Sequence, residues 1–296
     1  MAGDFSEKFS SSRAVFDRAS DVLSLDVLAI CTGDDPRLHL TEFTQPCILA
    51  AEIAMLSALR DDLGLRADLY GGHSLGEYTA LVAAGALTLE AALRLVRLRG
   101  RLMQGAVPAG QGGMVAVIQQ GLDLDMVKRV AADHDVDVAN FNSPSQVVLS
   151  GEAGAIDRAS DALEAAFEGT GGRVVALEVS APFHSRALAV IEPEFRAALV
   201  AEADAFDASR APAVTSNLGG GFHGADRDGI IDGLTRQISG SVRWMENMAA
   251  LSERAEVIYE VGPNKPLARF FKEQGRDVQS IINVRSAEKI FGGKAS

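Results

Sequence analysis

The 296-residue sequence predicts an α/β fold that carries a smaller inserted subdomain. Helical and strand-like segments alternate along most of the chain, which is typical of α/β proteins. The middle of the chain breaks this alternation with the order strand, helix, strand, strand, helix, strand. Glycine-rich stretches lie before this middle segment and within its last connection, so it is predicted to be a separate unit.

The first third of the chain is predicted to be mainly helical. Apolar residues recur with helical spacing over residues 5–22 and 45–63, and a longer helix rich in Leu and Arg is predicted over 88–106. Between these segments, residues 67–72 are predicted to form a short strand. It leads directly into a helix over residues 75–83.

The middle segment is predicted to be ferredoxin-like. Its predicted elements are a strand at 114–119, a helix at 124–134, strands at 136–139 and 146–150, a helix at 153–167 and a strand at 173–179. This βαββαβ order is that of ferredoxin-like units. We therefore expect residues 111–178 to form the small subdomain.

The α/β pattern resumes after the inserted segment. The predicted elements are a helix at 185–203, a strand at 213–216, helices at 230–239 and 244–251, a strand at 257–260 and a helix at 264–273. We expect residues 1–110 and 179–285 to form one large α/β-hydrolase-like subdomain with a mostly parallel sheet. Residues 286–296 are expected to be a tail.

Composition narrows the classes of function. The net charge of −12 argues against binding to a nucleic acid backbone or to an anionic membrane. No apolar run reaches the roughly 18 residues that a membrane helix needs, and the first residues do not resemble a signal peptide. The two cysteines, Cys31 and Cys47, form no CxxC pair. A reducing compartment is therefore expected, and we predict a cytoplasmic protein.

The clearest motif is Gly72-His73-Ser74-Leu75-Gly76, which fits G-x-S-x-G. Its predicted setting between a strand and a helix is that of a nucleophile elbow, so Ser74 is the candidate nucleophile. The N–H of Leu75 would donate to an oxyanion at the start of the helix. The alternative is a glycine-rich turn with an incidental serine, which the strand–turn–helix setting disfavours.

A serine nucleophile needs a base within hydrogen-bond reach, and the chain has five histidines. His184 lies in a loop between a predicted strand and a predicted helix, where catalytic groups of open α/β sheets gather. His73 flanks the serine, so its side chain should point elsewhere. The other three are predicted to lie in polar, loop-like or helix-surface settings: His39, His134 and His223. A loop histidine with a purely structural hydrogen bond remains an equal alternative for His184.

No acidic residue after His184 is a convincing partner for that histidine. A backbone carbonyl can replace the usual carboxylate, because it only has to accept the Nδ1 proton. The turn Gly262-Pro263-Asn264 at a predicted strand end is the candidate source of that carbonyl.

Arg99 is the candidate for a cation whose side chain points into the protein. Arg94, Arg97 and Arg101 share one face of the predicted helix by their three- and four-residue spacing, and Arg99 lies off that face between Leu98 and Leu102. The pattern weakly favours an Arg99 side chain that points inward. A solvated helix arginine is the alternative.

Several motifs together resemble malonyl-CoA:acyl-carrier-protein transacylases and the related acyltransferases of polyketide synthases. The segment Gly72–Tyr78 is similar to their GHSLGEY motif, and order and spacing agree over nearly the whole chain. The other similar segments are Thr44-Gln45-Pro46, Arg97–Gln104, Asn140–Pro144 with Gln146-Val147-Val148, Ala181–Ser185, Val242-Arg243-Trp244 and Glu260–Pro263.

The resemblance implies an acyl transfer from malonyl-CoA to the phosphopantetheine thiol of an acyl carrier protein. Ser74 would carry the malonyl group, His184 would be the base, and Arg99 would hold the free carboxylate with a bidentate pair. The backbone carbonyl of Asn264 would orient His184. The reaction would be ping-pong, with no cofactor and no metal.

The resemblance also implies further substrate contacts from Gln45, Asn142 and Phe183. In this family a Phe before the histidine accompanies malonyl, whereas a Ser there tends to accompany methylmalonyl. Phe183 would fill the space of a branch methyl, which provides about 1–3 kcal/mol of discrimination.

The sequence departs from the family pattern at its start. The first strand and its GQGSQ-type loop, which supplies a second oxyanion donor in the family, have no match before Phe5. Two other functions remain open. One is an acyl hydrolase that clears stalled acyl groups, which would not need a carboxylate-binding Arg99. The other is a truncated, inactive homologue that acts as a docking partner of a carrier protein. Polyketide synthase subunits are further candidate partners, and the motifs do not separate fatty acid from polyketide synthesis.

Overall fold

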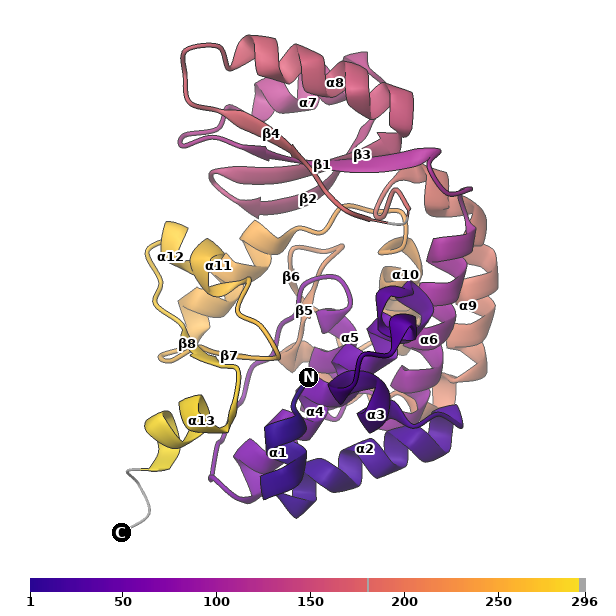
Figure 1. The fold of residues 1–296 in the computed structure, drawn as a ribbon, viewed down its shortest axis with the longest axis vertical. Helices are drawn as coiled ribbons and strands as arrows, with labels where there is room; N and C mark the ends of the chain where they lie inside the picture. The colour runs from indigo at the N-terminus through magenta and orange to yellow at the C-terminus, as the bar shows by residue number, and fades with distance from the viewer. Residues whose placement is uncertain (180, 293–296) are drawn as a thin grey trace.

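The first 105 residues fold mainly into helices, which form the lower and central part of the molecule (Figure 1). The computed structural model describes residues 1–179 and 181–292. The elements of this part are α1 (Gly3–Lys8), α2 (Ser10–Leu23), α3 (Val27–Thr32), the 3-10 helix η1 (Pro36–His39), α4 (Thr41–Asp61), α5 (Gly76–Ala84) and α6 (Leu89–Gly105). The start of α6 is fixed by Thr88, whose hydroxyl accepts the N–H of Ala91 as an N-cap. The long helices α4 and α6 pack along each other, which brings Gln45 and Arg99 together.

The middle of the chain forms a four-stranded antiparallel sheet. Its elements are β1 (Gly112–Ile118), α7 (Leu124–Asp133), β2 (Asp137–Ser143), β3 (Gln146–Glu152), α8 (Ala153–Ala166) and β4 (Arg173–Ala176). The strand order is β2-β3-β1-β4. Helices α7 and α8 cover the outer face of this sheet, at the top of Figure 1. The predicted order of elements for residues 111–178 is therefore found.

The two faces of this sheet are both apolar because side chains alternate along a strand. Val115 and Val117 pack with residues of α7 and α8 in one cluster. Met114 and Ala116 belong to a second cluster on the opposite face, against which Phe183 packs. The second face is thus turned toward the large part of the molecule and can form one wall of a cavity.

The rest of the chain returns to the large part. Its elements are η2 (Arg186–Ile191), α9 (Glu192–Ala201), η3 (Ala203–Ala205), η4 (Ala208–Ala213), β5 (Thr215–Ser216), β6 (Gly221–Phe222), α10 (Arg227–Arg236), α11 (Trp244–Arg254), β7 (Tyr259–Val261), α12 (Ala268–Glu273), β8 (Gln279–Ile281) and α13 (Val284–Phe291). The single helix predicted over 185–203 is divided into η2 and α9. Pro193 lies in the first turn of α9, where its missing N–H costs nothing, whereas it would break a continuous helix.

The mostly parallel sheet expected in the large part is reduced to short pieces within the described residues. The parallel pairing consists of β7 with β8 and bridges such as that of Tyr70 with Val214. Of the strand predicted over 67–72, only Tyr70 forms a β-bridge, so the rest of this prediction is wrong. The reason is local: the carbonyl of Gly72 accepts a hydrogen bond from the side chain of Asn217 instead of from a neighbouring strand.

Two predictions for the C-terminal part also need correction. The helix predicted from residue 264 begins at Ala268, because Pro266 disfavours helical backbone at the residue before it. Instead of a tail from residue 286, Val284–Phe291 form α13, which a capping box at Asn283 starts and which buries Ala287 and Phe291. Residues 293–296 of the predicted tail lie outside the described residues.

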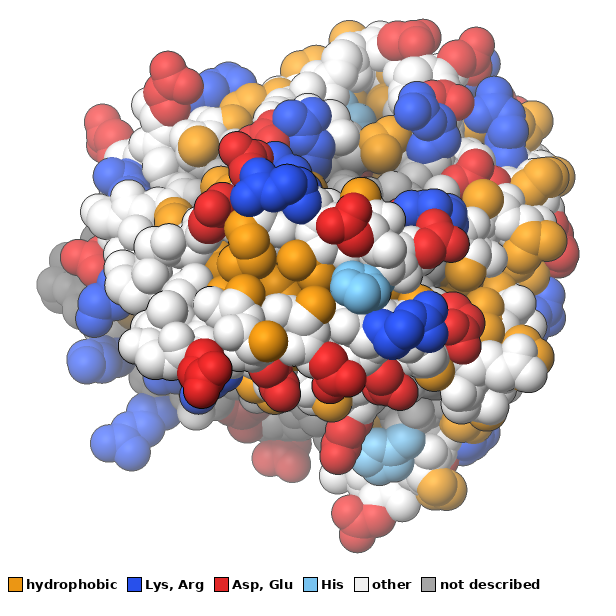
Figure 2. All heavy atoms as spheres, turned by 90° about the horizontal axis from the view of Figure 1, so that it is seen from above, with side chains coloured by type: hydrophobic (Ala, Val, Ile, Leu, Met, Phe, Trp, Pro, Cys, Tyr) orange, Lys and Arg blue, Asp and Glu red, His pale blue; other side chains and the backbone are white. Residues whose placement is uncertain are grey.

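Charged side chains of both signs are interspersed on the face formed by the small sheet and its helices (Figure 2). They surround a limited apolar patch, so the net negative charge is not gathered into one acidic field on this face. Among the helices of the described residues, none combines the length and the apolar character that a membrane span requires.

Candidate active site

Ser74 lies at a sharp turn between the bridge at Tyr70 and the start of α5. Its φ of 53° is in the left-handed region, which is strained for a residue with a side chain. The turn is also tight: a Cβ on Gly72 would lie 2.0 Å from the carbonyl oxygen of Gly76. Glycine is therefore required at position 72, as the elbow motif predicts.

The structure brings the predicted nucleophile and the predicted base together. The Oγ of Ser74 lies 2.7 Å from Nε2 of His184, although 110 residues separate them along the chain. His184 is buried and has a φ of 58°. Its loop is therefore held in a strained conformation next to the strained serine.

His184 is oriented by a carbonyl other than the predicted one. Its Nδ1 lies 2.9 Å from the backbone oxygen of Gln237, whereas Asn264 is an exposed residue of the turn after β7. Gln237 is the C-cap of α10, and carbonyls at the end of a helix have no partner within the helix. The assignment of this role to Asn264 is wrong, and Gln237 replaces it.

The Gln237 carbonyl also determines the tautomer of His184. Because a carbonyl can only accept, Nδ1 carries the proton and Nε2 is free to accept the hydroxyl proton of Ser74. Burial, and then the positive charge of Arg99, lower the pKa of His184 to about 3. The imidazole is therefore neutral at physiological pH, which is the state that a general base needs.

Arg99 is buried beside the nucleophile, with 2% of its surface exposed. Its Nη2 donates to the Oγ of Ser74 and to Oε1 of Gln237, both at 3.0 Å, and its Nη1 donates to Oε1 of Gln45 at 2.9 Å. All three acceptors are neutral. Within the described residues Arg99 forms no ion pair with a carboxylate, and its Nε has no partner. A buried guanidinium held by neutral oxygens is a preformed site for an anion.

A cavity of about 240 Å³ contains these groups. The large part contributes Gln45, Ser74, Leu75 and Arg99, and the histidine loop contributes Phe183 and His184. The inner face of the small sheet supplies Met114 and Asn140 to the opposite wall, and the segment after β4 adds Leu177 and Val179. The predicted pocket residues Gln45 and Phe183 therefore do line the cavity.

Asn142 does not line the cavity within the described residues, although Asn140 does. The side chain of Asn142 is buried, and its Oδ1 lies 2.8 Å from Nε2 of His73. Register shifts along β2 place these two asparagines in different surroundings. Asn140 has a buried Nδ2 without a partner in the described structure, so it is the asparagine with a free donor at the cavity.

The predicted oxyanion donor is well placed. Leu75 lines the cavity as the N-cap of α5, and no hydrogen bond to its N–H occurs within residues 1–179 and 181–292. The N-terminus of a helix adds a favourable field for negative charge. This N–H is thus available for an oxygen that becomes negative beside Ser74.

Sequence reasoning missed a buried polar cluster behind the serine. It consists of Glu77, Asn217, His223 and Gln237. His223, which was expected in a polar, loop-like or helix-surface setting, is buried, and its Nε2 lies 2.8 Å from Oε1 of Glu77. Glu77 could have been suspected as part of the GHSLGEY segment. Nothing in the sequence marked Asn217 or Gln237, because their contacts with Ser74 span 143 and 163 residues.

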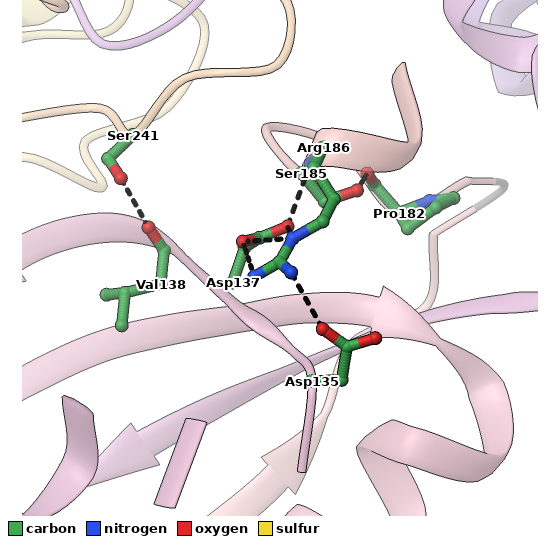
Figure 3. Close-up of polar contacts among 7 residues, drawn as sticks. All are labelled: Asp135, Asp137, Val138, Pro182, Ser185, Arg186 and Ser241. Atoms are coloured by element: carbon green, nitrogen blue, oxygen red, sulfur yellow. Dashed lines mark hydrogen bonds and ion pairs between the residues drawn. The ribbon is translucent and has the colours of Figure 1, made fainter. Parts of the chain in front are cut away.

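The loop that carries His184 is tied to the small sheet by Arg186 (Figure 3). The guanidinium donates to Asp137 through Nε and Nη2 and to Asp135 through Nη1, and the backbone N–H of Arg186 also binds Asp137. Beside this contact, the hydroxyl of Ser241 donates to the carbonyl of Val138. The histidine loop is thus fixed between the two parts of the molecule.

No three His, Cys, Asp or Glu side chains come together as a possible metal site in the part of the chain that the structure describes. The site instead combines a serine nucleophile, a neutral histidine and a fixed cation, which is the equipment of a serine acyltransferase.

The chain belongs to the acyl transferase domain family, whose model matches residues 3–263. It is 35% identical over 289 residues to a malonyl CoA-acyl carrier protein transacylase of Bacillus subtilis, which covers 95% of this chain and 88% of that relative. The crystal structure of a malonyl CoA-acyl carrier protein transacylase from Clostridium perfringens has a TM-score of 0.89 at 34% identity, over 99% of this chain and 92% of that one. A malonyl-transacylase solved in complex with a type II PKS acyl-carrier protein has a TM-score of 0.90 at 33% identity, over 99% and 95%.

Proposed function

We propose that the chain transfers the malonyl group from malonyl-CoA to the phosphopantetheine thiol of an acyl carrier protein, in fatty acid or polyketide synthesis. The observation that carries the proposal is the position of Arg99, a buried cation without a carboxylate partner within the described residues, 3.0 Å from the Oγ of Ser74. An acyl group with a free carboxylate fits this pair, since one end meets the nucleophile and the other meets the cation. The named relatives support the same substrate and the same acceptor.

In the first half of the reaction, Ser74 attacks the thioester carbonyl of malonyl-CoA. The hydroxyl proton passes to Nε2 of His184, which lies 2.7 Å away, while the carbonyl oxygen becomes an oxyanion beside the N–H of Leu75. The carbon–sulfur bond then breaks. His184 returns its proton to the departing thiolate, which leaves free CoA and a malonyl ester of Ser74.

The second half reverses these roles with a different thiol. The phosphopantetheine thiol of the carrier protein gives its proton to His184 and attacks the malonyl ester. The ester bond to Ser74 breaks, and the proton on His184 restores the serine hydroxyl. The carbonyl of Gln237 would keep Nδ1 protonated in both halves, so the same nitrogen would exchange the proton each time.

Arg99 would hold the free malonyl carboxylate throughout both halves of the reaction. Its bonds to Gln45, Gln237 and Ser74 are to neutral oxygens, which a carboxylate can replace because bonds between opposite charges are stronger. The free Nδ2 of Asn140 is a further donor at the same cavity. Phe183 would limit the space around the α-carbon of the acyl group.

Every proton and every leaving group in this cycle is handled by side chains of the chain or by the two thiols. The proposed reaction therefore uses no cofactor and no metal. We further propose that the protein acts in the cytoplasm, where acyl carrier proteins and malonyl-CoA would be its partners.

The finer description of the fold is part of the same proposal. The strand order β2-β3-β1-β4 with two helices on one face supports a ferredoxin-like subdomain over residues 111–178. An α/β-hydrolase-like architecture of residues 1–110 and 179–285 is supported by the turn at Ser74, which lies immediately before a helix.

Mass spectrometry of the intact protein after mixing with malonyl-CoA tests this function. We expect one malonyl adduct, located on Ser74, that persists until an acyl carrier protein with its phosphopantetheine arm is added and then moves to that arm. Release of free malonate with water as acceptor would instead indicate a hydrolase. Ser74→Ala is the control, and an adduct that forms on this variant would contradict the assignment of the nucleophile.

A further inference from the structure

The buried side chain of Asn217 binds the backbone of the turn at Ser74 and is not among the described residues that line the cavity. It follows β5, and its Oδ1 accepts the backbone N–H of Ser74 at 2.6 Å. Its Nδ2 donates to the carbonyl of Gly72 at 2.7 Å. One amide group therefore satisfies two peptide groups that flank the most strained part of the turn.

The elbow needs such a partner because its backbone cannot use a sheet. The φ of 53° at Ser74 turns the chain away from the extended conformation after Tyr70, so a strand neighbour cannot pair with both groups. A strained residue persists only where its surroundings fix it. The amide of Asn offers an acceptor and a donor on two atoms that are bonded to the same carbon, so it can bind an N–H and a carbonyl at the same time.

Asn217 is itself anchored by Glu77. The N–H of Asn217 donates to Oε2 of Glu77 at 3.0 Å, and the same oxygen accepts Nε2 of Gln237 at 2.7 Å. Nε2 of Gln237 also donates to the carbonyl of Ser74 at 3.0 Å. Both peptide groups of Ser74 are thus bound by side-chain amides, and one buried carboxylate binds the backbone of Asn217 and the amide of Gln237.

We propose that Asn217 is a positioning residue for acyl transfer. By fixing the peptide groups of Gly72 and Ser74, its amide aims the serine Oγ at His184 and the N–H of Leu75 at the oxyanion. Asn217 acts through the backbone and does not contact the acyl group. It therefore affects the turnover of every acyl group equally and leaves the choice of acyl group to Arg99. The inference rests on the proposed function only for the choice of acyl donor.

Asn217→Asp tests the role of the donor hydrogen. The introduced carboxyl has the size of the amide, but as a carboxylate it has no hydrogen for the carbonyl of Gly72. When protonated it regains one. The titratable groups around position 217 come from several elements. Glu77 of α5 binds the backbone of residue 217, and His223 binds Glu77. His73 lies next to Ser74 in the elbow, and Arg99 and His184 both contact Gln237. Burial and the charge of Glu77 both favour protonation of the new carboxyl, so the change falls in an accessible pH range.

The measurement is kcat and KM for malonyl-CoA and acetyl-CoA at pH 8 and at pH 5.5, each relative to the unsubstituted protein. At pH 8 we expect kcat of Asn217→Asp to be about 100-fold lower for both donors, since a misplacement of about 1 Å has an effect of that size. At pH 5.5 the deficit should shrink at least tenfold, while KM stays within about twofold. Asn217→Ala, which has no titratable group at this position, should show the same deficit at both pH values.

A pH-independent deficit in Asn217→Asp, an unchanged kcat at pH 8, or an effect confined to KM would overturn the proposal. Circular dichroism establishes that the variants are folded. If Asn217→Asp does not fold, Asn217→Ser takes its place, and its kcat must fall equally for both donors, because one hydroxyl cannot satisfy both peptide groups.

A fluorophosphonate, which labels Ser74 by loss of fluoride, separates this inference from the proposed function. It carries no acyl group and needs no carboxylate site. One outcome would refute the proposed function and support the role of Asn217. In it, the unsubstituted protein does not transfer malonyl, and Asn217→Asp is labelled more slowly than the unsubstituted protein at pH 8 but at the same rate at pH 5.5. Equal labelling rates in the two proteins refute that role.

Discussion

Replacing Arg99 by alanine is expected to change which acyl group the protein accepts. A guanidinium bonded to a carboxylate gains about 1.5–3 kcal/mol per hydrogen bond. The bonds to Gln45 and Gln237 that it gives up involve neutral oxygens and are about half as strong. For two bonds the difference is about 1.5–3 kcal/mol, which corresponds to roughly a 10- to 150-fold loss in kcat/KM for malonyl-CoA.

The assay is CoA release from a panel of acyl-CoAs, followed by transfer to a carrier protein. Acetyl-CoA has the same thioester and no free carboxylate, so its kcat/KM should change by less than about threefold in Arg99→Ala. Arg97→Ala is the matched control, because Arg97 lies on the same helix and its guanidinium pairs with Glu42 outside the cavity. Equal losses for malonyl-CoA and acetyl-CoA would refute the reasoning, since Arg99 would then support the elbow rather than the carboxylate.

Three further predictions follow from the site. Because the pKa of His184 is lowered from 6.5 to about 3, the unfolded chain binds a proton that the folded chain does not. The free energy of unfolding should fall by up to about 5 kcal/mol from pH 6.5 to pH 3, and urea unfolding of His184→Gln should lack this share; an unaltered pH dependence would contradict it. Gly72→Ala should lower Tm by about 6 °C or more, whereas Gly76→Ala, with open space around its Cβ, should not; similar Tm values would disprove the steric argument. Phe183→Ser should raise the use of methylmalonyl-CoA relative to malonyl-CoA by about tenfold in a competition assay, and an unchanged ratio would count against its place in the cavity.

The sequence predicted the parts of the site that depend on short motifs. The elbow at Ser74 requires a local glycine and a helix start, and both follow from adjacent residues. The offset of Arg99 against the other arginines of α6 favoured its inward direction but left a solvated side chain as the alternative. The order of elements in the small subdomain was also predictable from local sequence, because apolar residues repeat with one period in strands and with another in helices.

Long-range partners were not predictable in this way. The carbonyl that orients His184 comes from the end of α10, and any helix end in the chain could have supplied one. The predicted strand at 67–72 failed because a side chain, that of Asn217, binds Gly72 in place of a strand. The apolar face of α13 has a clear helical period, but its capping residues form a short Asn-to-Ser pattern that is weak evidence on its own.

The two parts of the molecule supply different groups to the shared cavity. Ser74 and Arg99 belong to the large part, whereas Met114, Asn140 and Leu177 line the same cavity from the inserted unit. Natural variation in that unit can therefore reshape the room available to an acyl chain while the proton-transfer machinery stays intact. The salt bridges of Arg186 with Asp135 and Asp137 lie where the inserted unit meets the histidine loop, so such variation would have to preserve these contacts.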